Sequence, residues 1–171
     1  MLVNVQDLRE VIPNLKCGDR VLLSGTVYTA RDAVHNRLSV MLENNEPLPF
    51  PIIDSVIYYA GPTQTPPNLP IGSCGPTTSS RMDVFAPSLL DLGLVAMIGK
   101  GPRSEEVVDA IVRNKAIYFC ALGGAGALAT KSIKSAEVVA LEHLGCESVK
   151  RLELDKFPLI VGIDCLGNSL F

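Results

Sequence analysis

Residues 94–122 have the sequence LVAMIGKGPRSEEVVDAIVRNKAIYFCAL, and this stretch decides the fold class. Its apolar runs Leu94–Ile98 and Ala116–Leu122 are typical of buried strands, while Glu105–Arg113 between them has the apolar spacing of a helix. A strand, a helix and a second strand in this order are typical of an α/β fold. The same order is predicted upstream, for the strand Arg20–Thr29, the helix Arg31–Asn44 and the strand Asp54–Ala60.

Towards the C-terminus the predicted elements are mainly strands. They are Val138–Leu141, Val149–Leu154 and Phe157–Asp164, followed by a hairpin turn at Leu166-Gly167-Asn168. Strands that follow one another closely are expected to pair antiparallel, so the pattern predicts a mixed sheet. Helices are predicted over Val5–Ile12 and Ala127–Lys134, and in a run that ends near Leu92.

Composition excludes several classes of function. The 171 residues contain 15 Lys and Arg and 18 Asp and Glu, which leaves a formal net charge of −3. Binding to nucleic acid needs a basic surplus to neutralise phosphates, so no nucleic-acid partner is expected. Apolar residues make up 47% of the chain, which is too many for a disordered protein and enough for a folded core.

A membrane location is not expected either. The longest stretch without charge, Ser55–Ser80, contains five prolines, and a spanning helix would not tolerate them together. Asp7, Arg9 and Glu10 interrupt the apolar residues near the N-terminus, which is unlike the apolar region of a signal peptide. The sequence therefore predicts a cytoplasmic protein.

The five cysteines are widely spaced, and none forms a Cys-x-x-Cys pair; they are Cys17, Cys74, Cys120, Cys146 and Cys165. This spacing is unlike a zinc finger or a disulfide framework. Because the thiols are not grouped, an iron–sulfur cluster held wholly by this chain is not expected. Reduced cysteines in or near the core are the simpler interpretation.

A loop rich in hydroxyl groups, from Gly75 to Arg81, precedes the helical run that ends near Leu92. Backbone N–H groups at a helix N-terminus, the hydroxyls of Thr77 and Thr78, and the Arg81 guanidinium are together suited to a small anion. Two further cations, Arg31 and Lys100, follow predicted strands, where ligands collect in α/β sheets. The alternative is an ordinary helix cap surrounded by separate surface charges.

A glycine-rich turn, Gly123–Gly126, follows the predicted strand Ala116–Leu122, and residues 124–129 resemble a dinucleotide fingerprint. Glu142 lies near the position of a ribose-binding acid. The alternative is a turn that packs closely, without a cofactor. His35 lies one helical turn after Arg31 and is interpreted as a structural or surface histidine.

Four segments, in this order and spacing, resemble one family: Thr29–His35, Gly75–Asp83, Gly99-Lys100-Gly101 and Gly123–Ala127. Residues 131–135 and the closing segments Phe157-Pro158 and Asp164–Asn168 resemble it as well. The family is the β subunit, or C-terminal domain, of iron–sulfur hydro-lyases of the class I fumarate hydratase and L-tartrate dehydratase type. The Gly-Pro-Thr-Thr-x-x-Arg-Met motif is specific for it, whereas the glycine turn is not.

The resemblance implies a single domain over residues 1–171, folded as a compact swivelling β/β/α domain with a mixed, nearly closed sheet flanked by helices. It also implies a separate α subunit that ligates a 4Fe–4S cluster through three cysteines, so this chain would hold no metal. A higher-order heteromer of the two subunits is expected. The iron would act as a Lewis acid on a C4 dicarboxylate.

The resemblance further implies roles for individual residues. Arg31, Arg81 and Lys100 would bind substrate with Thr78, and Thr77 would be the base that removes the carbon-bound proton. Thr77 as a residue that only orients the substrate stays an alternative, because a threonine hydroxyl is a weak base. Fumarate and malate are the expected substrate pair, with tartrate next. A non-catalytic module that binds a dinucleotide or a small anion is the alternative function.

Overall fold

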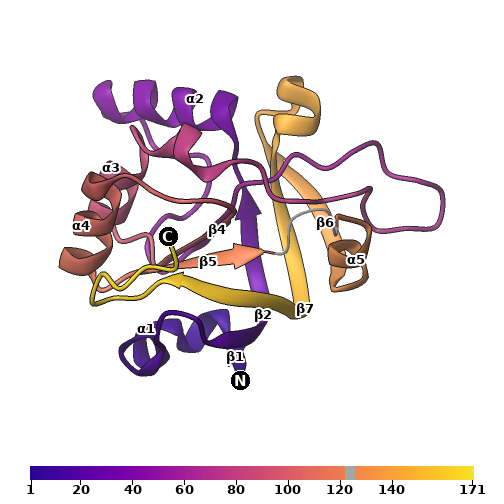
Figure 1. Ribbon diagram of the computed structural model, residues 1–171. Helices are drawn as coiled ribbons and strands as arrows, with labels where there is room; N and C mark the ends of the chain where they lie inside the picture. The colour runs from indigo at the N-terminus through magenta and orange to yellow at the C-terminus, as the bar shows by residue number, and fades with distance from the viewer. Residues whose placement is uncertain (122–125) are drawn as a thin grey trace.

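Five strands close into a barrel-like ring at the centre of the computed structural model, which describes residues 1–121 and 126–171 (Figure 1). In ring order they are β2 (Arg20–Thr29), β3 (Val56–Tyr58), β4 (Ala96–Gly99), β5 (Ile117–Ala121) and β7 (Val149–Ile163). The first four are parallel to their neighbours, and β7 closes the ring by pairing antiparallel with both β5 and β2. The expected mixed, nearly closed sheet is thus confirmed.

Two more strands extend the ring to either side. β1 (Leu2–Asn4) adds parallel to β2, and β6 (Ile133–Ala140) adds antiparallel to the first half of β7. The sequence predicted two separate strands where β7 is one strand of 15 residues. Lys156 lies in the left-handed region at φ 53°, and its N–H donates to Ser24 Oγ at 2.9 Å. Such a local irregularity bends a strand without ending it, so β7 can pair with β2 and β5 in the ring and also with β6.

Three helices cover the outer face of β3, β4 and β5: α2 (Asp32–Glu43), α3 (Ala86–Asp91) and α4 (Glu105–Asn114). Side chains such as Tyr58 and Ile98 belong to the core cluster that unites all five ring strands, whereas Tyr59 and Met97 pack against these helices. Because both faces of these strands are buried, their sequences are continuous apolar runs.

Several predicted helices differ from the structure. The stretch Val5–Ile12 divides into the 3-10 helix η1 (Val5–Asp7), the short helix α1 (Leu8–Val11) and the 3-10 helix η2 (Ile12–Asn14). The predicted run to Leu92 divides into the 3-10 helix η3 (Ser79–Met82) and α3. Pro87 explains that break, because its ring clashes with the carbonyl four residues earlier and stops a helix from continuing. The helix predicted over 127–134 ends earlier, as α5 (Gly126–Lys131), and β6 begins at Ile133.

A loop over residues 61–73 projects from the body between β3 and η3 (Figure 1). Residues 63–70 are all exposed. Hydrogen bonds in both directions close its base, since the Thr63 N–H donates to the Ser73 carbonyl at 3.0 Å and the Ser73 N–H donates to Thr63 Oγ1 at 2.9 Å. None of the helices in the described residues has the length and apolar character needed to cross a membrane.

Candidate functional site

The Gly-Pro-Thr-Thr segment runs across the carboxyl ends of β3 and β4. Pro76 forms a bridge with Ala60, and the Thr77 N–H donates to the Tyr59 carbonyl at 2.7 Å. One residue later, Thr78 forms a parallel bridge with Lys100, directly after β4. Thr77 is half-buried, and Thr78 and Lys100 are exposed. Backbone pairing with two neighbouring strands therefore places the threonines at the carboxyl ends of the parallel strands, which is where ligands collect in α/β sheets.

Ser79 anchors this segment from below. Its N–H donates to the Lys100 carbonyl at 3.0 Å, its Oγ accepts from the Lys100 N–H at 3.0 Å, and the Tyr118 hydroxyl donates to Oγ at 2.9 Å. Gly99 is required here because a Cβ would collide with Ser79 Oγ. Gly101 serves the turn instead, at φ +82°. Glycine is thus needed on the two sides of Lys100 for different reasons: space for Ser79 at Gly99 and backbone conformation at Gly101.

Arg31 and Arg81 meet at Asp32, the first residue of α2. The Nε of Arg81 donates to Asp32 Oδ1 at 2.9 Å, and Arg31 Nη2 lies 3.8 Å from Asp32 Oδ2. Arg31 lies at the N-cap position of α2, directly after the carboxyl end of β2, and Arg81 lies in η3. Side chains far apart in the sequence therefore share one carboxylate.

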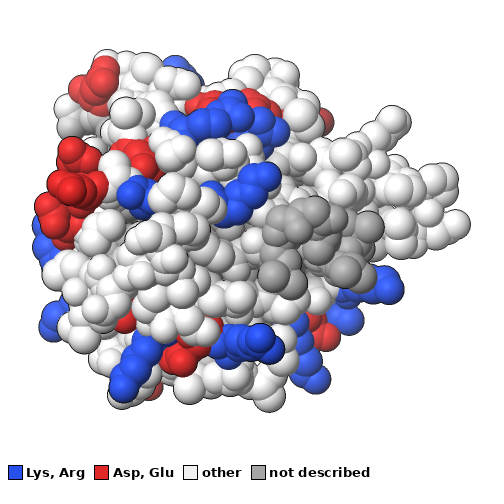
Figure 2. Space-filling model, viewed as in Figure 1, with Lys and Arg blue, Asp and Glu red and all other residues white. Residues whose placement is uncertain are grey.

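Glu147, in the 3-10 helix η4 (Glu142–Glu147), holds Arg31 from the other side. Its Oε1 is 3.2 Å from Arg31 Nε, and its Oε2 accepts from the Ala33 N–H in the first turn of α2 at 3.4 Å. Figure 2 shows the basic and acidic groups side by side where α2 begins next to η4. We call Arg31, Asp32, Arg81 and Glu147 the open cluster.

The predicted site residues thus lie at one end of the barrel. Arg31 and Lys100 follow the carboxyl ends of β2 and β4, which belong to one parallel run, and the threonines and Arg81 follow one another along the loop between them. The sequence pattern gave no sign of partners for these cations, but both arginines are paired with carboxylates. Lys100 forms no ion pair with any described residue of the chain.

The prediction that a long helix begins after the threonines is wrong. η3 has only four residues, and Thr78 at its N-cap makes no side-chain hydrogen bond to the helix. So short a helix contributes little dipole. The structure therefore gives little support to a helix dipole at Thr77.

Sequence reasoning missed Asp32, Glu147 and the buried Arg103. Asp32 lies next to Arg31 in the motif, which is a signal that could have indicated it. Nothing local indicates Glu147, because it reaches Arg31 from the segment before β7. Arg103, with a fully buried side chain, donates to Asp83 Oδ1 at 2.7 Å beneath the site.

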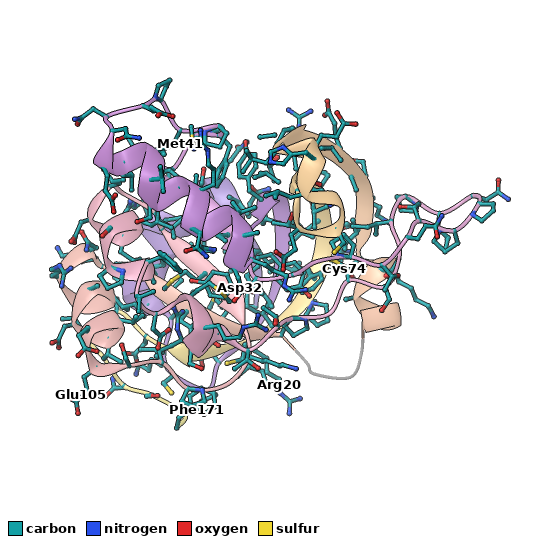
Figure 3. The ribbon with its side chains drawn as sticks, turned by 90° about the horizontal axis from the view of Figure 1, so that it is seen from above. Arg20, Asp32, Met41, Cys74, Glu105 and Phe171 are labelled. Atoms are coloured by element: carbon teal, nitrogen blue, oxygen red, sulfur yellow. The ribbon has the colours of Figure 1, made fainter. Side chains whose placement is uncertain are left out.

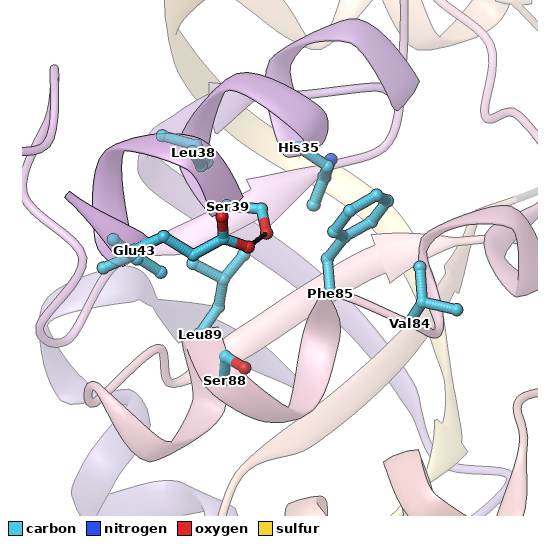
Figure 4. A pocket seen from close by; sticks show the side chains of 9 residues that line it. His35, Leu38, Ser39, Glu43, Val84, Phe85, Ser88 and Leu89 are labelled. Atoms are coloured by element: carbon cyan, nitrogen blue, oxygen red, sulfur yellow. Dashed lines mark hydrogen bonds between the residues drawn. The ribbon is translucent and has the colours of Figure 1, made fainter.

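His35 is buried, so of the two interpretations from the sequence, structural or surface histidine, the structure supports the first. Its Nδ1 donates to the Arg31 carbonyl at 2.8 Å, so the neutral ring carries its lone pair on Nε2. Burial lowers its pKa to about 4, which keeps the ring neutral. It lies beside Phe85 at the back of a cavity of about 200 Å³ between α2 and α3 (Figure 4).

The thiols form no metal site in the described structure: within residues 1–121 and 126–171, no three His, Cys, Asp or Glu groups lie together to hold an ion. Cys74 is buried at the base of the projecting loop, and burial raises the pKa of its thiol to about 12 (Figure 3). It is a small packing residue beside the Tyr58 hydroxyl, which donates to the Cys74 carbonyl at 2.6 Å. Residues 123–125 of the glycine turn lie outside the described residues, so the dinucleotide interpretation stays a prediction.

The family model described as the fumarase C-terminus matches residues 1–171. This chain belongs to that family. It is 38% identical to fumarate hydratase 2 of Leishmania major over 98% of its own length, and 38% identical to the aerobic class I fumarate hydratase of Escherichia coli over 96%. It spans only about 30% of the length of these two relatives. It is also 40% identical to a putative L(+)-tartrate dehydratase subunit beta of Methanocaldococcus jannaschii, covering 94% of this chain and 85% of that one. The resemblance found in the sequence is confirmed.

Proposed function

We propose that this chain is the β component of a two-component hydro-lyase that hydrates and dehydrates a C4 dicarboxylate. The observation that carries the proposal is the gathering of Arg31, Arg81, Lys100 and Thr77 at one end of the barrel, in a member of this family. Guanidinium forks bind carboxylates in a bidentate manner, and an ammonium adds a charge without such geometry. Two carboxylates are therefore the feature of a substrate that this set would select.

The partner is proposed to be an α component that holds the 4Fe–4S cluster and supplies a Lewis acid. The described thiols of this chain do not fit as ligands, because Cys74 is buried and no three metal-binding groups lie together among the described residues. In the two fumarate hydratases named above, the region that matches this chain makes up about 30% of one longer polypeptide. Assembly into a higher-order heteromer and a cytoplasmic location stay predictions.

Thr77 is proposed as the group that removes the carbon-bound proton. Its alkoxide would gain from Lys100, whose backbone pairs with the adjacent Thr78, and from the arginines of the open cluster. Thr78, exposed one residue later, is proposed to orient substrate.

The test is an anaerobic assay of the chain co-purified with a cluster-bearing α partner, on malate, fumarate and tartrate. We expect interconversion of fumarate and malate, or dehydration of tartrate, by the pair and by neither chain alone. No turnover of any of the three by a cluster-loaded pair would overturn the proposed function.

The role of Thr77 is tested by exchange of the substrate's carbon-bound proton with solvent. Thr77→Val removes the hydroxyl and keeps the shape, so we expect it to lower kcat and the exchange rate with little change in KM. Thr78→Val is the matched control, with a loss of about fivefold, corresponding to ~1 kcal/mol. If Thr77→Val still exchanges the proton at the wild-type rate, Thr77 only orients the substrate.

A further inference from the structure

Both arginines of the open cluster have a carboxylate next to the Nε edge of the guanidinium group, as a hydrogen bond to Arg81 and as an ion pair without a hydrogen bond to Arg31. Asp32 Oδ1 accepts from Arg81 Nε at 2.9 Å, and Glu147 Oε1 lies 3.2 Å from Arg31 Nε. An arginine side chain has one Nε–H and four N–H groups on the two terminal nitrogens. A carboxylate at Nε leaves the terminal N–H groups of Arg81 available to a ligand. The terminal groups of Arg31 are available as well, because Nη2 lies 3.8 Å from Asp32 Oδ2, too far for a hydrogen bond.

The backbone around Arg31 restricts it further. A Cβ on Gly61 would lie 2.9 Å from Arg31 Cδ and 3.0 Å from Nη1, so the side chain passes directly over this glycine. Glu147 is itself fixed, because its second oxygen accepts from the Ala33 N–H. Arg31 thus lies between a glycine that lacks a side chain and a carboxylate tied to the start of α2.

Buried polar atoms without a hydrogen-bond partner are concentrated at this point of the described structure. They are Arg31 Nε, Asp32 Oδ2 and His35 Nε2, all from the first turn of α2 and the residue before it. Each unsatisfied buried group in a native protein needs an explanation, such as stored strain, a functional role or a bound water or ion. Figure 3 shows Asp32 at the beginning of α2.

We propose that Asp32 and Glu147 are positioning residues, which present the terminal N–H groups of Arg81 and Arg31 to a substrate carboxylate. This inference rests on the proposed function for its kinetic consequence. The two carboxylates also balance the charge of the two arginines, so the cluster stays in place without a ligand. Lys100, unpaired among the described residues, supplies the net positive charge that attracts a dianion.

The test is a pair of crossed double-mutant cycles on the assembled enzyme, with malate or whichever of the three substrates it turns over. Asp32→Ala is expected to raise KM by about 10- to 100-fold, the usual effect of losing a charged hydrogen-bond partner. In an Arg81→Ala background the same change should add less than about twofold, because Asp32 acts through Arg81. Glu147→Ala should behave in the same way toward Arg31→Ala.

The crossed combination is the internal control. Glu147→Ala and Arg81→Ala affect different arginines, so their effects on KM should multiply. Asp32→Asn keeps an oxygen that accepts from Arg81 Nε and should lose less than Asp32→Ala. Glu46→Ala removes a carboxylate that pairs with Arg37 at 3.5 Å near the other end of α2, and should leave KM unchanged. Multiplicative effects of Asp32→Ala and Arg81→Ala would overturn the proposal.

A second readout needs no activity and separates this inference from the proposed function. In nitrogen-15 spectra of the chain, the Arg81 Nε–H should exchange with water at least about tenfold faster in Asp32→Ala than in the wild-type chain, because a hydrogen-bonded proton exchanges only after its bond opens. Unchanged exchange would overturn the positioning role even in an active enzyme. Faster exchange in a chain whose cluster-loaded pair turns over no dicarboxylate would refute the proposed function alone.

Discussion

Arg103 and Arg81 each donate from Nε to an aspartate, at 2.7 Å to Asp83 and at 2.9 Å to Asp32, but in different surroundings. The Arg103 side chain is 0% exposed, whereas that of Arg81 is 51% exposed. Arg103 also donates to the Tyr59 hydroxyl at 3.3 Å, and its guanidinium lies 5.2 Å from the centre of the Tyr59 ring. Asp32, in contrast, keeps one buried oxygen without a hydrogen-bond partner.

The difference separates an arginine used for the scaffold from an arginine available to a ligand. The second oxygen of Asp83 accepts from the Ser104 N–H at 2.7 Å, so the buried pair has its partners within the chain. A buried pair of this kind is costly to break, because either partner alone would be an uncompensated charge. The side chains of the open cluster can still form further hydrogen bonds, and Arg81 is half exposed to solvent. Removing Arg81 should therefore affect binding more than folding.

Breaking the buried pair should have the largest effect. Arg103→Met is expected to lower the free energy of unfolding by about 3–5 kcal/mol, because Asp83 is left buried without a cation. Urea unfolding followed by circular dichroism measures this. The double variant Arg103→Met with Asp83→Asn should recover part of the loss. A loss below about 1 kcal/mol in the single variant would contradict the scaffold role.

Breaking the ion pair between Arg81 and Asp32 should affect activity more than stability. Arg81→Ala is expected to change the free energy of unfolding by no more than about 1 kcal/mol. In the assembled enzyme it should lower kcat/KM by roughly 30- to 5,000-fold, the equivalent of about 2–5 kcal/mol. Arg81→Lys should recover little, because an ammonium lacks the fork. Arg37→Ala, at an exposed position on α2, is the control; near-normal kcat/KM in Arg81→Ala would make Arg81 a solvated surface residue.

Acid should lower the free energy of unfolding through protonation of His35 in α2, whose ring is influenced by both Asp32 and Arg103. Burial lowers its pKa from 6.5 to about 4, so the unfolded chain binds a proton that the folded chain does not bind in this range. Stability from this group is complete above pH 6.5 and declines as the pH falls to about 4, by roughly 3 kcal/mol in total. Unfolding free energies at pH 7, 6, 5 and 4 should fall more steeply in the wild-type chain than in His35→Leu. Parallel pH profiles would show that His35 does not titrate in this way.

The smallest effects are expected at the two glycines around Lys100. Gly99→Ala should lower the free energy of unfolding by about 1–3 kcal/mol, because the added Cβ meets Ser79 Oγ beneath the site. Gly101→Ala meets no atom within 4 Å and should cost roughly 1 kcal/mol, from its positive φ alone. Thermal unfolding of both variants checks the order. A larger loss in Gly101→Ala would mean that the turn, not the Ser79 contact, fixes Lys100.

Much of the fold could be predicted from local patterns. Arg20–Thr29 is a strand with the predicted bounds, and the helix and strands around it agree with their predictions to within a few residues. The prediction failed where neighbours along the chain do not decide the structure. The break expected between Leu154 and Phe157 became a bend at Lys156, because β2 pairs with β7 on both sides of it.

The sequence by itself determined the periodicity of the strands and helices, the mixed α/β class and the motif that contains Thr77 and Arg81, because these depend on residues near one another in the chain. Tertiary structure alone decided that β7 closes the ring, that Arg103 is buried beneath the site and that Asp32 and Glu147 hold the two arginines. The residue patterns predicted only a mixed sheet, and the nearly closed form came through the family resemblance. Each of these features joins segments distant in the sequence, and pairing, burial and charge between such segments leave no period or spacing in the local pattern.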